Sequence, residues 1–513
     1  MVPDSLFVYS IPESTRVKLI LEDKFLHLDY EQAAQNALQP TGCLPAIACS
    51  APTGAHHRNS IYYFNILWVE YQTTTPSSAR ATLCIDYCST TANKTAALEK
   101  VTFAVDPDTK DMCDTWIEQL LQRAYCLSAP PLTAGGPTRQ INITRCKKFM
   151  ALVNPFSGQG RAIRYFRELA LPIFNAAHCE VDEIQTQYKC HATDLVSEAP
   201  DLETKYDAIV CCSGDGIVHE VFNGLAQRPN PAHAFASVPV CQLPGGSGNA
   251  LCANLVGCKN VPFAALCVVK GVPVHFDLCS LSQGNKRSMT FLSQALGMIA
   301  DCDIGTEHLR WMGESRFTLG VVQRVLTRAS YPAEIYMHVV HDSRAELRKN
   351  YRHHSSKPYP HDDLPLALPD QPEPLVDLKY GTINDSVPGD WFRFDAPNLA
   401  VFYAGQMPWM SSDALFFPAA LPRDGLFDIV IIDSKVPILE IAKILLGVEH
   451  GSHFESSHVH YYKVDAYRII PKAKSGYISI DGEFFDFAPF QVEIHPSLGT
   501  VLSHTPSFQA PGV

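Results

Sequence analysis

Long apolar segments are missing from this sequence of 513 residues. The most apolar candidate, residues 429–448, is interrupted by Asp433, Lys435, Glu440 and Lys443. A helix needs about 20 consecutive apolar residues to cross a bilayer, so no membrane span is expected. If the protein works on a membrane component, it must reach that component from the membrane surface.

Cysteine is absent after Cys302, and the arrangement of the 17 cysteines does not suit zinc. None of the cysteines stands in a Cys-x-x-Cys pair. The histidines at 453–460 form a dense group, but no carboxylate or cysteine has the spacing that would complete a metal site with them. We therefore expect no direct protein ligand for a metal. The number of cysteines is odd, and the N-terminus has neither a basic region nor a long apolar run. Both features predict that the protein is located in the reducing cytoplasm.

Basic residues are outnumbered, with 41 Lys and Arg against 53 Asp and Glu, which gives a formal charge of −12. Non-specific nucleic-acid binding needs a basic face, so nucleic acid is not an expected partner. The hydrophobic content of 46% and the charged content of 18% are those of a folded protein with ample core. The length allows about three domains.

The composition changes along the chain and predicts a multidomain protein. Short β-rich segments followed by one helix resemble a pleckstrin-homology-like β-barrel, and a Pro/Gly-rich linker follows. Buried strands then alternate with helices, which predicts a parallel α/β sheet, before antiparallel patterns take over. A polar, proline-rich insertion in this last region is expected to be disordered. The boundaries are 1–127, linker 128–146, 147–273, 274–500 with the insertion 342–392, and a tail at 501–513.

Three glycine-rich turns follow three of the predicted buried strands, at residues 154–160, 213–216 and 243–249. Each leads into a helical pattern, so backbone amides and helix N-termini can face an anion at the carboxyl edge of the sheet. The sequence has neither a Walker P-loop nor the His-Arg-Asp motif of protein kinases. A single turn of this kind is weak evidence, but three at successive strand ends predict a nucleotide-phosphate site.

Asp215 stands between Gly214 and Gly216 in the second of these turns. A carboxylate beside nucleotide phosphates can orient an attacking hydroxyl and accept its proton. The alternative is a turn aspartate that caps the following helix. The two neighbouring phosphate turns favour the catalytic interpretation.

The motifs SGDG, HEVFNGL and LPGGSGNAL resemble the diacylglycerol kinase-like catalytic domain. Residues 293–320, 424–432 (DGLFDIVII) and 480–483 (IDGE) narrow the resemblance to the sphingosine kinases. The resemblance covers about 147–500 without the insertion. It implies that 274–500 form a lipid-binding β-sandwich, with the nucleotide in the cleft between this domain and the α/β domain.

The resemblance also implies roles for individual residues. It makes Asp215 the catalytic base and Asp303, with Ser293 nearby, the site of the amine-bearing head group. A carboxylate beside an apolar segment would favour a cation over a neutral lipid. The nucleotide-binding positions are Asn154, Ser157, Gly158, Gly160, Thr186, Ser213, Gly214, Gly216, Glu220, Gly246, Ser247, Gly248, Asn249, Arg310, Arg316, Asp481, Gly482 and Glu483. The substrate-binding positions, besides Asp303 and Ser293, are Ile299, Cys302, Phe317, Ile441, Ile444, Leu445, Val448 and His453.

The function implied is an ATP-dependent lipid kinase that uses Mg²⁺, held by the nucleotide phosphates and water. It would phosphorylate the primary hydroxyl of sphingoid long-chain bases (sphingosine, dihydrosphingosine or phytosphingosine) to give the 1-phosphate. A ceramide or diacylglycerol kinase and a catalytically silent lipid-binding or docking module are the alternatives. We expect a cytoplasmic protein that is peripherally associated with the endoplasmic reticulum, Golgi or plasma membrane, and a homodimer is left open.

Overall fold

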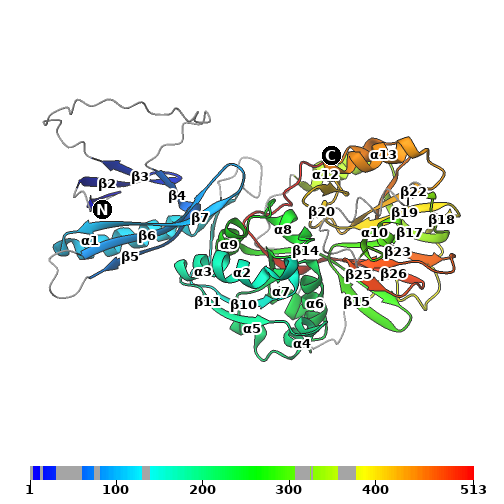
Figure 1. Cartoon of the computed structure of the whole chain (residues 1–513), viewed down its shortest axis with the longest axis horizontal. Helices are drawn as coiled ribbons and strands as arrows, with labels where there is room; N and C mark the ends of the chain where they lie inside the picture. Colours follow the sequence, from blue (N-terminus) through cyan, green and yellow to red (C-terminus); the bar gives the residue numbers. More distant parts are fainter. Residues whose placement is uncertain are drawn as a thin grey trace. The chain divides into compact units, whose positions relative to one another are not determined.

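A computed structural model describes residues 4–11, 15–30, 60–73, 81–129, 139–306, 324, 327–355 and 377–513 (Figure 1). The chain divides into two compact units. The first comprises Met1–Leu127, Gln140–Arg145 and Asn175–His178, and the second comprises the rest. The predicted site lies entirely in the second unit.

The first unit contains one antiparallel seven-stranded sheet with the strand order β4-β3-β2-β1-β7-β6-β5. Among the described residues of this unit, one α-helix, α1 (Lys110–Ala124), follows the sheet and buries Trp116 and Leu120. The sheet and its one terminal helix agree with the predicted element types, whereas closure into a pleckstrin-homology-like barrel stays a prediction. The strands are β1 (Ser5–Ser10), β2 (Arg16–Leu21), β3 (Phe25–Tyr30), β4 (Ser60–Tyr62), β5 (Ile66–Gln72), β6 (Ala81–Thr90) and β7 (Ala96–Val105).

The second unit begins with a parallel sheet in the order β11-β10-β12-β13. Strands β10, β12 and β13 are almost continuous runs of buried residues, as expected when helices cover both faces of a sheet, whereas the edge strand β11 is half-buried (Figure 1). The strands are β10 (Lys148–Val153), β11 (Glu180–Gln185), β12 (Ala208–Ser213) and β13 (Val240–Pro244). The helices are α2 (Ala162–Tyr165), α3 (Leu171–Ala176), α4 (His191–Glu198), α5 (Leu202–Lys205), α6 (Asp215–Ala226), α7 (Pro231–Ser237), α8 (Ala250–Leu255) and α9 (Val261–Val269).

An antiparallel β-sandwich follows the parallel sheet. Its strands are β14 (Val272–Gln283), β15 (Lys286–Thr290), β16 (Ser293–Gly297), β17 (Ala333–His341), β18 (Phe392–Ala396), β19 (Leu399–Gly405), β20 (Trp409–Ser411), β21 (Ala414–Leu415), β22 (Phe427–Asp433), β23 (His460–Pro471), β24 (Ile478–Ile480), β25 (Glu483–Phe485) and β26 (Phe490–Ser503). Its helices are α10 (Met298–Asp303), α12 (Arg344–Ser355) and α13 (Ile438–Gly447).

Strand β26 joins the parallel and the antiparallel parts of the second unit into one continuous sheet. It pairs antiparallel with β14 and β23, and at Val501 it pairs parallel with Val240 of β13. Residues 501–503, predicted as part of a tail, are therefore strand. Gln509 beyond them is also held, because its N–H donates to the Asn254 carbonyl at 2.7 Å.

The insertion at 342–392 was predicted to be disordered, and the structure corrects this at both of its ends. Helix α12 is fixed because Leu347 is fully buried and the Arg344 guanidinium donates to the Val459 carbonyl at 2.8 Å. On the other side, the N–H groups of Lys379 and Tyr380 donate to the Glu493 carboxylate. Residues 356–376 lie outside the described part.

The linker at 128–146 is likewise not a plain connection. Its ends form a two-stranded sheet from β8 (Cys126–Ala129) and β9 (Arg139–Asn142). The apolar side chains of Ile141 and Ile143 are buried, which accounts for the order of this segment. Residues 130–138 lie outside the described part.

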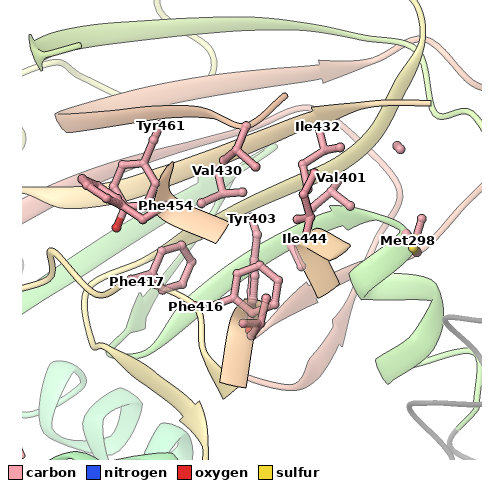
Figure 2. Close-up of a cluster of buried hydrophobic side chains, with 14 of the residues drawn as sticks. Met298, Val401, Tyr403, Phe416, Phe417, Val430, Ile432, Ile444, Phe454 and Tyr461 are labelled. Atoms are coloured by element: carbon pink, nitrogen blue, oxygen red, sulfur yellow. The ribbon is translucent and has the colours of Figure 1, made fainter. Parts of the chain in front are cut away.

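A cluster of buried apolar side chains lies on one side of the sandwich (Figure 2). Tyr403 packs against Phe416 and Phe417, with ring centroids 4.9 and 5.1 Å apart. Ile444 of α13 lies beside these rings, so this helix covers the cluster. We call this group of buried side chains, which includes Tyr403, Phe416, Phe417 and Ile444, the apolar cluster.

Candidate active site

The three glycine-rich turns meet at the carboxyl edge of the parallel sheet, and their backbones touch. A Cβ on Gly158 would lie 2.4 Å from the Gly245 oxygen, and one on Gly246 would lie 2.3 Å from the Gly214 Cα. A Cβ on Gly214 would lie 3.0 Å from the Gly248 oxygen. Because contacts this short exclude side chains, only glycine permits the packing. The result is a cradle of backbone in which the three turns pack together without side chains between them.

Side-chain amides fix the shape of two of the turns. The Asn249 Oδ1 accepts from the Gly246 N–H at 2.9 Å, and its Nδ2 donates to the Gly246 carbonyl at 2.8 Å. The Asn154 Oδ1 accepts from the Phe156 N–H at 2.9 Å. The Ser213 hydroxyl is buried and donates to the next carbonyl. These three predicted nucleotide-binding residues therefore shape the cradle with their side chains.

Other predicted nucleotide-binding residues lie on the surface of the cradle. Ser247 and Gly160 are exposed, and Ser157 is half-buried, with its Oγ accepting from the Gly214 N–H at 3.4 Å. Gly160 has a φ of +79°, which glycine adopts without strain.

Asp215 is the first residue of α6 and is only 8% exposed. Its Oδ2 accepts from the Ala250 N–H at 2.9 Å, and its Oδ1 accepts from the Leu251 N–H and the Gln242 Nε2, both at 3.2 Å. A carboxylate has about four acceptor positions, so three donors leave one position for a further proton. Gly248 adjoins this carboxylate, because a Cβ there would lie 3.1 Å from Oδ2.

Burial raises the pKa of Asp215 to about 6, because desolvation outweighs the three hydrogen bonds that lower it. The negative charge of Asp481 adds to the increase. A carboxylate with this pKa is ionised at neutral pH and is more basic than an ordinary aspartate. Asp215 therefore has the properties of a general base.

The helix that Asp215 caps is not the one that the sequence suggested. The carboxylate accepts the first two N–H groups of α8, 35 and 36 residues further along, and not those of its own helix α6. The expectation that the N-terminus of α8 faces a phosphate is therefore wrong, since the anion at that position is Asp215. The N-terminus of α6, with Gly216, is left facing the cradle.

Asp481 is buried and holds the corner between β15 and β16. Its carboxylate accepts from the N–H groups of residues 291–293 at 2.9 to 3.1 Å and from the Thr290 hydroxyl at 2.6 Å. The His219 Nδ1 of α6 completes the set at 2.8 Å. Five donors use all the acceptor capacity of this carboxylate. Asp481 thus ties the sandwich to α6.

Glu483 begins β25 and lies beside the cradle. Its Oε1 would be 2.9 Å from a Cβ on Gly216, so this glycine leaves room for the carboxylate. Its Oε2 pairs with the Lys189 Nζ at 3.0 Å. The predicted nucleotide-binding residue therefore meets a cation at the N-terminus of α6.

Glu220 and Thr186 are positioned by backbone contacts. The Glu220 carboxylate accepts from the N–H groups of Cys190 and Ala192 at 2.9 and 3.1 Å, which caps α4. The Thr186 N–H extends the β11–β10 pairing by donating to the Val153 carbonyl at 3.0 Å. Thr186 directly follows the end of β11, whereas Glu220 lies in the middle of α6 and holds the N-terminus of α4.

The predicted head-group residues lie close to Asp481 and Glu483 in the structure. The Asp303 Oδ2 accepts from the Ser479 hydroxyl at 2.6 Å, and it would be 3.8 Å from a Cβ on Gly482. The Ser293 Oγ is 3.3 Å from the Tyr403 hydroxyl. The head-group residues therefore adjoin the IDGE turn.

Tyr403 links these residues to the apolar cluster. Burial is the main cause that raises the pKa of its phenol, and the negative charges of Asp303, Asp481 and Asp215 raise it further. The phenol therefore lies in the field of all three carboxylates, while its ring belongs to the apolar cluster. This arrangement places a neutral hydroxyl where polar and apolar parts of the site meet.

The predicted substrate-binding residues with apolar side chains belong to the apolar cluster. Cys302, Ile441, Ile444 and Val448 are buried in it, and Ile299 and Leu445 pack against it. His453 lies at its edge, where its Nε2 is 2.9 Å from the Phe416 carbonyl. Burial lowers the pKa of His453, so the ring is neutral at pH 7.

Three predicted site residues, Arg310, Arg316 and Phe317, lie outside the described part of the chain. Within the described ranges, no group of three His, Cys, Asp or Glu side chains is arranged to hold a metal ion. In the same ranges, no helix combines the length and the apolar character needed to cross a membrane.

Sequence reasoning missed three residues of the site. Gln242 is a polar residue within a buried strand, and this was a usable signal. Lys189 follows a strand end, as the predicted phosphate turns do, but it carries no motif of its own. Tyr403 stands in an apolar run that reads as core, and only the tertiary structure places its hydroxyl beside Ser293.

Comparisons with known families agree with the division of the chain into an N-terminal sheet, a parallel α/β part and an antiparallel sandwich. Residues 148–281 match the diacylglycerol kinase catalytic domain, and residues 386–503 match the YegS C-terminal NAD kinase beta sandwich-like domain. Residues 10–126 match a domain of unknown function. The parallel sheet and its cradle therefore form a catalytic domain of the diacylglycerol kinase class.

Individual relatives show to which family within this class the chain belongs. Sphingoid long chain base kinase 5 of Saccharomyces cerevisiae is 35% identical over 75% of this chain, and the match covers 61% of that protein. Sphingoid long chain base kinase 4 of Schizosaccharomyces pombe is 33% identical over 90% of this chain and 92% of that protein. The chain belongs to the sphingoid long chain base kinase family. Among solved structures, a putative diacylglycerol kinase from Bacillus anthracis matches 70% of this chain and 96% of that chain, with 17% identity and a TM-score of 0.49.

Proposed function

We propose that the protein is a lipid kinase that transfers the γ-phosphoryl group of ATP to the primary hydroxyl of a sphingoid long-chain base. The observation that carries this proposal is Asp215, a buried carboxylate with raised pKa and one remaining acceptor position, placed between glycine turns that exclude side chains. The names of the relatives support the substrate class.

In the proposed reaction, Asp215 accepts the proton of the attacking hydroxyl. The hydroxyl oxygen forms a bond to the γ-phosphorus while the bond from that phosphorus to the β,γ-bridging oxygen breaks. ADP leaves with the electron pair of the broken bond, and the product is the 1-phosphate. Magnesium, held by phosphates and water, would neutralise charge on the phosphates. Lys189 and the backbone of the cradle would hold the nucleotide, together with Arg310 and Arg316.

The head group would meet Asp303. A sphingoid base carries an ammonium next to its hydroxyls, and a carboxylate beside an apolar cluster offers a charge-assisted hydrogen bond to it. An N-acylated ceramide or a diacylglycerol has no such cation, so Asp303 favours the free base. The alkyl chain would occupy the region of the apolar cluster. We expect a cytoplasmic enzyme that visits the membrane surface.

The experiment is ATP-dependent phosphorylation of dihydrosphingosine, phytosphingosine, ceramide and diacylglycerol by the wild type and by Asp215→Asn. We expect phosphorylation of the free bases only, and its loss in Asp215→Asn. Asp303→Asn should weaken the discrimination between free bases and ceramide. Phosphorylation of ceramide or diacylglycerol in place of the free bases would contradict the role of Asp303, and no turnover by the wild type on any of the four lipids would contradict the proposal as a whole.

A further inference from the structure

Two leucines on the outer face of α13 are unusually exposed. Leu439 and Leu446 are 77% and 78% exposed, and of the large apolar side chains in the described ranges only Phe156 reaches the same exposure. They are seven residues apart, which places them two turns apart on one side of the helix, with Lys443 between them. We call these three residues the outer face of α13.

The opposite side of the same helix is buried in the apolar cluster. Ile441 and Ile444 are 4% and 3% exposed, and Ile444 lies beside Tyr403 (Figure 2). Surface helices of globular proteins usually have one apolar side that faces the core and one polar side that faces water. Helix α13 has apolar residues on both sides, and it separates the apolar cluster from the surroundings of the protein.

We propose that the outer face of α13 docks on the surface of a lipid bilayer. This inference rests on the proposed function, because the inner face of the helix covers the region assigned to the alkyl chain. A helix that contacts the bilayer on one side and the apolar cluster on the other gives a lipid chain a short path between the two. The outer face thus lies on the opposite side of α13 from the region assigned to the alkyl chain, and neither leucine belongs to that region.

The size and charge of the outer face fit a bilayer better than a second copy of this chain. A stable protein interface buries about 800 Å² on each partner, from about 20 to 30 residues. The outer face offers two leucines, and the neighbouring Lys435, Glu449 and His450 are exposed and polar. Interfacial docking needs only a narrow apolar stripe with a cation that can reach the headgroup phosphates. Lys443 supplies that cation: its side chain is 71% exposed, and its partner Glu440, at 2.7 Å, is also on the surface, so the ammonium can exchange this exposed ion pair for a headgroup phosphate.

The test is flotation of the full chain with vesicles of phosphatidylcholine and phosphatidylserine. We expect the double variant Leu439→Gln/Leu446→Gln to bind at least tenfold more weakly than the wild type, equivalent to about 1.4 kcal/mol. Leu169→Gln is the matched control, because this leucine is also exposed but lies in the α/β part of the second unit. Its binding should equal that of the wild type.

A gain-of-binding variant makes the test independent of any folding defect. Leu439→Trp/Leu446→Trp should bind more tightly, and its indole emission should shift to shorter wavelength on vesicles, because tryptophan favours the bilayer interface. Equal vesicle binding by the wild type and the glutamine variant would overturn the proposal, as would a wild type that does not bind. A dimer that dissociates only in the glutamine variant would assign the face to a second copy instead.

Kinase activity provides the separate readout for the proposed function. With a sphingoid base in detergent micelles, all of these variants should turn over like the wild type, because neither leucine touches the site. Vesicle binding that depends on the outer face, without phosphorylation of any base in micelles, would support the docking surface and refute the proposed kinase activity.

Discussion

At the scale of single residues, the protonation of Asp215 sets the chemistry that the site can perform. The carboxylate is buried, yet it receives three N–H donors, and the balance leaves a pKa of about 6. Asp481 has five donors in a comparable position and no capacity for another. The difference in donor number leaves only Asp215 with an acceptor position for a further proton, which supports the proposed role of this carboxylate as the base.

The pH dependence of turnover should report this pKa. With saturating Mg-ATP, kcat/KM for the sphingoid base should be constant above pH 7 and fall about tenfold per pH unit below pH 6, because protonated Asp215 cannot accept the hydroxyl proton. Initial rates between pH 5 and 8 provide the measurement. A plateau that continues to pH 5 would contradict the assignment of Asp215 as the base.

Tyr403→Phe should raise KM for the sphingoid base about five- to tenfold with little change in kcat. The substitution removes one hydroxyl at the boundary of the head-group and tail regions, and a hydrogen bond of this kind contributes about 1 kcal/mol. Tyr467→Phe is the matched control. The buried Tyr467 hydroxyl donates to the Gln294 Oε1 at 3.0 Å, and Tyr467 is not part of the apolar cluster. Equal effects of the two substitutions on KM would show that the first acts through stability alone.

At the scale of elements, the three turns act as one unit because their backbones are in contact. Gly246 belongs to the turn after β13, and the position of its absent Cβ is 2.3 Å from the Gly214 Cα in the turn after β12. Neither turn can move without the other. The same contact joins Asp215 to the phosphate cradle, since Asp215 follows Gly214 directly.

Gly246→Ala should therefore reduce turnover by about a hundredfold or more, because the facing backbone must shift by roughly 1 Å and misplacement on that scale is costly for catalysis. Steady-state kinetics of the purified variant give the measurement. Gly389→Ala is the control, since nothing lies within 4 Å of a Cβ there and its φ is not positive. A Gly246→Ala enzyme with wild-type turnover would mean that the turns do not hold the phosphates.

At the scale of the whole molecule, a buried ionic group joins two neighbouring strands of the sandwich to helix α12. The Lys463 Nζ of β23 pairs with Asp424 at 2.8 Å and with Asp428 of β22 at 3.3 Å, and all three side chains are fully buried. The Asn350 Nδ2 of α12 donates to Asp424 at 2.8 Å. The group thus holds α12, which belongs to the corrected part of the insertion, against the sheet.

Lys463→Met should lower the free energy of unfolding of the second unit by about 3–5 kcal/mol, because it leaves buried carboxylates without their cation. Urea denaturation at pH 7 measures the change. The variant should lose less stability at pH 5, since burial raises the pKa of Asp428 to about 7 and protonation below that pH removes the uncompensated charge. Lys443→Met, which removes an exposed ion pair with Glu440, should leave the midpoint nearly unchanged.

Local patterns predicted much of the α/β part correctly. The apolar runs at 149–153, 208–212 and 238–243 are β10, β12 and β13, and the apolar periodicity at 217–227 is α6. These predictions succeeded because a strand covered on both faces and a helix with one buried side leave a direct mark on hydrophobicity. The predicted disorder of the insertion is wrong at its two ends, 342–355 and 377–392, because the polar composition hides the few contacts that order these residues.

The sequence by itself determined which residues can perform the chemistry: glycines where no side chain fits, and one aspartate between them. Only the tertiary structure decided what each carboxylate does. Asp215 meets donors 35 and 36 residues away, and Asp481 meets donors about 190 residues away. The hydrogen-bond donors of these two carboxylates cannot be predicted from sequence spacing. They depend on which ends of strands are brought together by the crossovers of the sheet and by the pairing of β26. Burial, which raises the pKa of Asp215, is likewise a property of the packed molecule.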